Sequence, residues 1–283
     1  MPLGRVSELL DDLYACQVSE GTLVAWVQLA AERLAPTVAQ IADWLSAGAL
    51  QHADETGVRI AGKRRWLHVN STGLLTHLAW HAKRGRQALE DIGIWPRFRG
   101  RALRDRWASY DYYPCAQSIC GAHLVRDCVY VYEQEQQPWA EEMADLLLSM
   151  AEAANEWRQR GAHAVPAEEG DAWIAQYFEL LACGFAAQPP PSREAIRKQR
   201  GRQKQSAAKN LLDDLLRRAE QVLAFLDDLS IPFTSNQAER DLRMVKVQQK
   251  IFGTDLCRDC NRILKHRGIP RRFLFEATVA TKQ

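Results

Sequence analysis

The hydrophobic residues of positions 1–48 recur at the spacing of amphipathic helices. Leu9, Leu10 and Leu13 fall on one side of a first helix. Ser19 is of a residue type that caps helices, and it stands just before the apolar run Thr22–Val27, so a second helix is predicted to begin there. Two helices joined by a short connection match either a helix-turn-helix or a plain helical hairpin that packs on the main domain. The pattern leaves both alternatives open.

From residue 50 to residue 81 the hydrophobic period changes to two. Thr56, Val58 and Ile60 alternate with polar residues, and turn residues at 61–63 and 71–73 separate this strand from two further apolar runs. The segment therefore predicts three antiparallel strands joined by short turns.

Helix and strand signals alternate after this meander. A helix over about Arg84–Ile92 is predicted to end at Gly93, and a short strand covers Ala102–Asp105. A further strand near Ser118–Cys120 precedes a helix through Leu124. Antiparallel strands followed by this alternation favour an α/β fold, with a mixed sheet and helices on its faces.

The chain from Pro138 to Leu229 is predicted to be helical throughout, with two apolar stripes that we interpret as core. The first stripe runs from Trp139 to Trp157 and the second from Leu211 to Leu229, including Leu216. A proline-rich loop and a basic run lie between the stripes, and a last helix covers Asn236 to about Lys250. The predicted parts are a helical N-terminal segment, the first part of a catalytic core, a helical insertion, the final core helix and a basic tail, at 1–48, 49–135, 136–230, 231–250 and 251–283.

Composition adds little to this picture. The 283 residues carry a formal net charge of +2, which neither requires nor excludes a nucleic-acid partner. Seven cysteines, an odd number, indicate a reducing compartment. The start of the chain has no apolar core of signal-peptide length, and no run approaches the roughly 20 apolar residues that span a bilayer. We therefore expect a cytoplasmic protein.

Three acidic residues stand out by their context. Asp54 lies on the first predicted strand, Asp105 at the end of the fourth, and Glu239 in the first turn of the last helix. Carboxylates crowded in one site repel each other unless a cation neutralises them, and Mg²⁺ prefers carboxylate oxygens while leaving positions open for phosphate. Two such ions about 3.5–4 Å apart can assist an in-line displacement at phosphorus. Taken singly, each residue is better explained without catalysis: Asp54 as a surface acid of a strand, Asp105 as a strand-end or turn acid, and Glu239 as the partner of Asn236 in a capping box.

Four segments in this order resemble the transposases of the insertion-sequence-66 family. They are His52–Arg59 (HADETGVR), Asp105–Tyr110 (DRWASY), Cys120–Asp127 (CGAHLVRD) and Ser235–Arg243 (SNQAERDLR). The resemblance runs from about Arg5 to about Lys250. It implies an RNase H-like fold, a DDE triad of Asp54, Asp105 and Glu239, and DNA strand transfer that depends on Mg²⁺ or Mn²⁺.

The resemblance also implies double-stranded DNA as partner, both the ends of the element and its target. Basic residues near the triad suit a DNA backbone. The candidates are Arg243, Lys246 and Lys250 on the last helix, His123 and Arg126 one turn apart, and Arg197, Lys198, Arg200 and Arg202 in the basic run. His123 could equally be a buried hydrogen-bonding residue, and the basic run a solvated linker. We expect a homo-oligomer on DNA, with accessory proteins encoded by the element as a further candidate partner.

The sequence departs from the family in three places. Full-length members of the family open with a zinc-binding segment and further helices, whereas this sequence opens directly on the central region, so we expect recognition of the terminal repeats to be affected. Arg104 is an unusual residue for a central strand. After Ile251 the family's apolar helical tail is replaced by a basic one, for which a frameshift is the simplest hypothesis. A lone Cys257-x-x-Cys260 in this tail is weak evidence for zinc.

The expected function is therefore that of a DDE transposase. Two alternatives stay open: a catalytically inactive DNA-binding remnant of a transposase, and an RNase H-like nuclease that acts on branched DNA.

Overall fold

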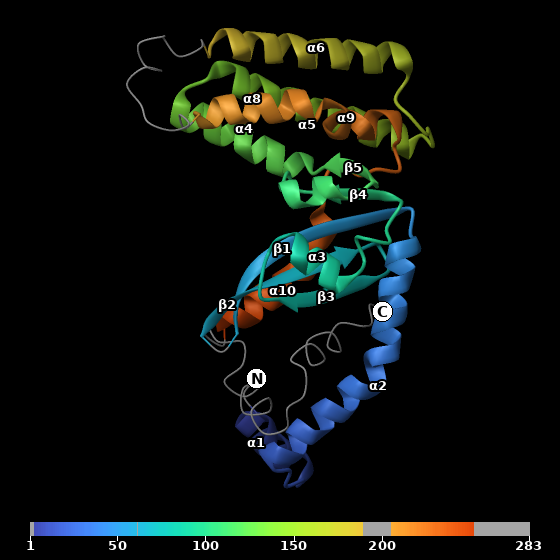
Figure 1. Cartoon of the computed structure of the whole chain (residues 1–283), viewed down its shortest axis with the longest axis vertical. Helices are drawn as coiled ribbons and strands as arrows, with labels where there is room; N and C mark the ends of the chain where they lie inside the picture. The colour runs from blue at the N-terminus through green and yellow to red at the C-terminus, as the bar shows by residue number, and fades with distance from the viewer. Residues whose placement is uncertain (1–2, 61, 189–204, 252–283) are drawn as a thin grey trace. The chain divides into compact units, whose positions relative to one another are not determined.

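A computed structural model describes residues 3–60, 62–188 and 205–251 (Figure 1). Several predicted features lie outside these residues: most of the proline-rich loop, the basic residues Arg197, Lys198, Arg200 and Arg202, and the tail with its Cys257-x-x-Cys260. The described chain divides into two compact units. The first unit comprises Met1–Ala102, Trp107–Ala116 and the chain from Asn236 onward, and the second comprises Leu103–Arg106 and Gln117–Ser235.

The first unit contains the predicted meander. Its elements are α1 (Leu3–Tyr14), α2 (Glu20–Ala47), β1 (Leu50–Ile60), β2 (Lys63–Ser71), β3 (Thr76–His81), α3 (Arg86–Ile92), the 3₁₀ turn η1 (Ala108–Tyr112) and α10 (Asn236–Ile251). Antiparallel pairing joins β1 to β2 and β2 to β3, as the period of two predicted. The predicted caps are also confirmed: the Ser19 hydroxyl accepts the Thr22 N–H at 3.1 Å, and Gly93 ends α3 with φ 79°.

Five strands form one mixed sheet in the order β3-β2-β1-β4-β5, which makes the fold α/β as expected. β4 covers Arg101–Arg104 and β5 covers Ala116–Ile119. Both strands begin and end slightly earlier than predicted, so Asp105 follows β4 directly and Cys120 precedes the next helix.

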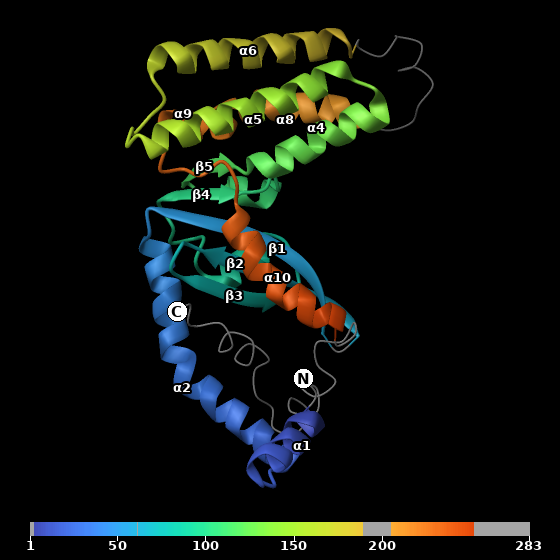
Figure 2. The same ribbon diagram turned by 180° about the vertical axis from the view of Figure 1, so that it is seen from behind.

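Helices cover both faces of the meander in the first unit (Figures 1 and 2). On one face Val58, Leu67 and Val69 pack against Leu242 and Val245 of α10. On the other face Ala53 packs with residues of α3 and η1, among them Leu89 and Tyr110. Successive side chains of a strand point to opposite faces, so neighbouring residues of β1 enter different environments.

The second unit is mainly a helical bundle. Its helices are α4 (Gly121–Glu135), α5 (Pro138–Gln159), α6 (Ala167–Ala186), α8 (Ala207–Arg217) and α9 (Ala219–Asp227). Both predicted stripes contribute to one buried cluster, which includes Met143 and Leu147 from α5 and Leu212 and Leu215 from α8. The stripe prediction is wrong for Leu216, which is 49% exposed, because the helix turns this residue away from the face that its neighbour Leu215 buries.

The sheet of the first unit buries a histidine. His68 on β2 is 1% exposed. Burial lowers its pKa from 6.5 to about 4; the backbone of Lys83 opposes this shift, while His81 and Arg84 lower the pKa further. The folded protein therefore holds His68 neutral at pH values where the unfolded chain protonates it.

A pH dependence of stability follows from this histidine. Between pH 6.5 and pH 4 the unfolded state binds more protons at His68, so the free energy of unfolding should fall as the pH is lowered through this window, by up to about 3 kcal/mol. Urea unfolding at several pH values measures the effect. In the His68→Gln variant this contribution should be absent, and wild-type and variant profiles of the same slope would contradict the assignment.

Candidate functional site

The first predicted carboxylate, Asp54, lies in the middle of β1 on the α10 face. The pairing of β1 with β2 is continuous from His52 to Ile60, so Asp54 shares its face with Val58, which packs against α10. Asp54 is half-buried, and its Oδ1 accepts the backbone N–H of Glu55 at 2.8 Å. The side chain is thus held on the face that the last helix covers.

Two hydrogen bonds fix how α10 runs across this face. Asp241 Oδ2 accepts from the Thr76 hydroxyl at 2.8 Å, and Thr76 belongs to the sheet row of Ser71 and His52. Further along the helix, Lys246 Nζ donates to the carbonyl of Gly57 at 2.9 Å. The helix therefore runs in the same sense as β1.

The direction of α10 determines where the second carboxylate, that of Glu239, lies. Glu239, Leu242 and Lys246 follow each other at the three- and four-residue spacing of one helix face. Leu242 is buried on the sheet and Lys246 contacts β1, so this face is the one turned to the sheet. Half-buried Glu239 lies in the first turn of α10, two residues before Asp241, at the end of the helix that faces the His52 row of β1. The structure thus brings Asp54 and Glu239 onto packed elements of one sheet face.

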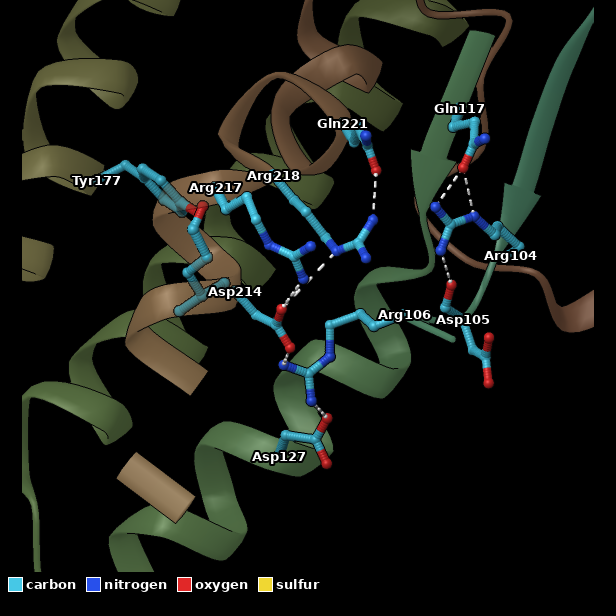
Figure 3. A network of polar contacts seen from close by, with 11 residues as sticks. Arg104, Asp105, Arg106, Gln117, Asp127, Tyr177, Asp214, Arg217, Arg218 and Gln221 are labelled. Atoms are coloured by element: carbon cyan, nitrogen blue, oxygen red, sulfur yellow. Dashed lines mark hydrogen bonds and ion pairs between the residues drawn. The ribbon is translucent and has the colours of Figure 1, made fainter. Parts of the chain in front are cut away.

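The third carboxylate, Asp105, belongs to the second unit and follows β4 directly. Its neighbour Arg104 is fully buried. The Arg104 guanidinium donates from Nη1 to the carbonyl oxygen of Asp105 and from Nε to Gln117 Oε1 on β5, both at 2.7 Å. Figure 3 shows the Asp105 carboxylate pointing away from this guanidinium. Arg104, an unusual residue for a central strand, therefore holds the backbone of Asp105 in place.

Arg106, the residue that follows Asp105, is also held in place by contacts of its side chain. Its guanidinium donates to Asp127 of α4 and, at 3.2 Å, to Asp214 of α8 (Figure 3). Asp214 also pairs with Arg217 at 2.5 Å. Asp105 is thus flanked by two arginines that are each anchored elsewhere in the second unit. The contact also joins the segment DRWASY to the segment CGAHLVRD.

Cys120 joins the third quoted segment to the start of the fourth. The Ser235 N–H donates to Cys120 Sγ at 3.2 Å, and the next residue of the chain begins α10. Burial raises the pKa of the Cys120 thiol, but hydrogen bonds with His123 and Ser235 outweigh it and bring the pKa below its ordinary value. This contact supports the hydrogen-bonding alternative for His123. By accepting this hydrogen bond, the Cys120 thiol fixes the position of Ser235, the residue before α10.

Gly121 beside this thiol leaves no space for a side chain. Its N–H donates to the Phe233 carbonyl at 2.8 Å, and an added Cβ would lie 2.1 Å from the Phe233 ring. That ring packs edge-on against Phe225, with 5.1 Å between ring centroids. The ring cannot move aside without disturbing the core of the second unit.

We expect Gly121→Ala to lower the free energy of unfolding by about 1–3 kcal/mol, the usual cost of overpacking. Thermal unfolding followed by circular dichroism measures it. Gly170→Ala is the matched control, because a Cβ at that helical position meets no atom within 4 Å among the described residues. The control should unfold at the wild-type temperature or slightly higher. Equal behaviour of the two variants would contradict the packing argument.

The predicted DNA contacts are distributed over both units. Arg243 and Lys246 are exposed on α10, and Arg126 is exposed on α4. The side chain of Lys250 is not among those described, and the four residues of the basic run lie outside the described chain. Their role in DNA binding stays a prediction.

A buried charged group next to Asp54 was not predicted. Glu55 points to the opposite face of the sheet, where its side chain is completely buried. Its Oε1 accepts from Arg84 Nε at 2.7 Å, and its Oε2 accepts from the Tyr110 hydroxyl. The available signal was the alternation of β1, which puts an acid at a position that faces the core.

The side chains at the candidate site include donors that suit a divalent metal ion. Among the residues that the structure describes, no group of three or more His, Cys, Asp or Glu side chains is arranged to hold a metal ion. The chemistry of the donors nevertheless suits Mg²⁺, which is commonly held by one or two carboxylates together with water and substrate phosphate. Asp54 and Glu239, two half-buried carboxylates on packed elements of one face, are donors of this kind.

A comparison with protein families shows the class to which this protein belongs. The family model that matches residues 1–256 is one of transposases. The chain belongs to the IS66 family of transposases. The match confirms the resemblance seen in the four segments. No curated protein matches the chain. None of the described helices is both long enough and apolar enough to cross a membrane.

Proposed function

We propose that this protein is a DDE transposase, which cleaves the DNA of an insertion sequence and transfers its strands with the help of Mg²⁺ or Mn²⁺. The proposal assigns an RNase H-like core to the α/β sheet, and the roles of catalytic residues and metal ligands to Asp54, Asp105 and Glu239. Membership of a transposase family supports the reaction class and DNA as the partner. The observation that carries the site is the placement of Asp54 and Glu239 on one face of the sheet, on elements that pack together.

The three carboxylates would hold the ion through their oxygens. A bound divalent ion supplies charge neutralisation at the phosphate and a lowered pKa for a nucleophilic water. The chain itself supplies the positions. β1 and α10 hold Asp54 and Glu239, while Arg104 holds the backbone of Asp105 through its carbonyl oxygen. Positioned groups of this kind reduce the entropy that must be lost at the transition state.

The proposed reaction has two displacements at phosphorus. In the first, a water oxygen attacks a phosphodiester at the end of the element, the P–O bond to the 3′-oxygen breaks, and a free 3′-hydroxyl remains. In the second, that hydroxyl attacks a phosphodiester of the target DNA and displaces its 3′-oxygen, which leaves as a hydroxyl. No oxidant or external energy source is needed, because the number of phosphodiester bonds is conserved in the second step.

A strand-transfer assay tests this proposal. The substrate is a labelled duplex that carries the terminal sequence of the element encoding this protein, mixed with an unlabelled target plasmid and Mg²⁺. We expect a shortened strand with a 3′-hydroxyl and a label joined to the plasmid. Binding of the duplex without either product would contradict the enzymatic proposal.

That outcome would favour a second candidate, a catalytically inactive DNA-binding remnant of a transposase. One observation supports it: the match to the family ends at residue 256 of 283. The homo-oligomer and the accessory proteins expected from the resemblance are part of the same proposal. Sedimentation of the protein with and without paired element ends would reveal the oligomer.

A further inference from the structure

The end of the β1–β2 hairpin carries an unusual concentration of positive charge. Residues 57–66 contain four cationic residues and no acidic one: Arg59, Lys63, Arg64 and Arg65. Within the described parts of the chain, none of these four forms an ion pair. Arg59 stands directly opposite Arg64 in the strand pairing, and like charges in that position destabilise a sheet. The sequence thus keeps a local repulsion that folding alone does not require.

This end of the hairpin is a two-stranded ribbon in the first unit. β3 pairs with β2 only from Trp66 to Ser71, so Lys63–Arg65 extend beyond it (Figure 1). β4 begins at the other end of β1, where the Arg101 N–H donates to the Ala49 carbonyl. α10 covers one face of the ribbon, because Val58 and Ile60 pack against it. The other face carries Arg59 and Arg64.

Stacked rings and guanidinium groups give this face a defined shape. The Arg64 guanidinium lies 4.7 Å from the centroid of the Trp66 ring, and Arg84 lies 5.0 Å from the same ring. Arg84 also stacks 4.2 Å from the Trp107 ring and is neutralised by buried Glu55. These contacts hold Arg64 against the sheet, so less side-chain entropy is lost when it binds a partner.

We propose that the Arg59–Arg64 face of this hairpin binds the phosphate backbone of duplex DNA. The inference rests on the proposed function for the identity of the polyanion. Cations without an ion-pair partner on an exposed sheet face match the negative charge of the phosphate backbone, and each phosphate that they neutralise releases counterions. This surface is additional to the residues of α10 and α4 predicted above.

The test measures the affinity for a duplex of about 30 base pairs and unrelated sequence as a function of salt, by fluorescence anisotropy. Each lost phosphate contact reduces the slope of log K against log salt by about 0.9. The double variant Arg59→Ala/Arg64→Ala should therefore reduce the slope by about 2. Its stability should not fall, because the variant removes a repulsion. Arg59→Ala alone, which leaves the Trp66 stack intact, should reduce the slope by about 1.

The matched control removes two other exposed arginines, Arg97 and Arg160, which pair with Asp43 and Glu156 respectively. Arg97→Ala/Arg160→Ala changes the net charge by the same amount and should leave the slope unchanged. An equal loss in hairpin and control variants would show a general charge effect and overturn the proposal, as would an unchanged slope in the hairpin variants. A wild-type protein that does not bind duplex DNA would contradict the proposed function itself.

Discussion

Replacing Asp54 with asparagine is expected to reduce DNA cleavage in Mg²⁺ by about 10³-fold or more, while the protein folds and binds DNA as before. The change removes one negative charge from the site that should hold the ion, which is the interaction that strengthens as charge develops at phosphorus. Folding should be preserved, because the amide oxygen of asparagine can still accept the Glu55 N–H that Asp54 accepts now. Single-turnover cleavage of an element-end duplex measures the rate, and thermal unfolding checks the fold. Cleavage at the wild-type rate would contradict the catalytic role of Asp54.

The same chemical change one residue later should have a different consequence. Glu55→Gln is expected to lower the free energy of unfolding by about 2–3 kcal/mol, because hydrogen bonds from charged groups are worth about that much when they are buried. The variant removes the anion that neutralises Arg84, and it replaces one of the two acceptor oxygens with an NH2 donor, so Arg84 and Tyr110 no longer each have an oxygen of their own. The side chain of Arg84 is 35% exposed, so water recovers part of the loss. Urea unfolding measures the change.

Comparing Asp54→Asn with Glu55→Gln distinguishes the roles of the two faces of β1. Asp54→Asn should leave the unfolding midpoint in place and remove cleavage, whereas Glu55→Gln should lower the midpoint. Equal midpoints for Glu55→Gln and the wild type would contradict the structural role of Glu55. A lowered midpoint for Asp54→Asn would show that this carboxylate, too, stabilises the fold.

Much of the fold could be predicted because its signals are local. The alternation around Val58, the cap at Ser19 and the glycine at position 93 each depend on a few neighbouring residues. Strand ends shifted by one or two residues, because hydrogen bonding across the sheet, rather than the sequence pattern, decides where a strand stops. Leu216 was placed in the core since its side of the helix cannot be told from hydrophobicity alone.

The contacts around the candidate site could not be predicted from pattern. Arg106 and Asp214 are separated by 108 positions, and the Cys120–Ser235 contact spans 115. No periodicity links residues so far apart. The resemblance did indicate that these segments belong together, and the structure gives a physical reason in two cases. Arg106 binds Asp127, and Cys120 holds the residue before α10.

Arg104 departs from the sequence pattern of a buried strand for a structural reason. An arginine in a buried strand position conflicts with the apolar pattern of a central strand. Its guanidinium is nevertheless satisfied by Gln117 and by the backbone carbonyl of Asp105. The cost of burying the cation is offset by these hydrogen bonds, and the result is a fixed backbone at the proposed catalytic residue.

The proposed triad is tested most directly through Asp105, the member that belongs to a different compact unit from Asp54 and Glu239. The measurement is the rate of Mg²⁺-dependent cleavage of an element-end duplex by Asp105→Asn, compared with the wild type and with Asp54→Asn. If three carboxylates serve one reaction centre, Asp105→Asn should be as inactive as Asp54→Asn, with duplex binding retained. Cleavage by Asp105→Asn at the wild-type rate would contradict the DDE assignment.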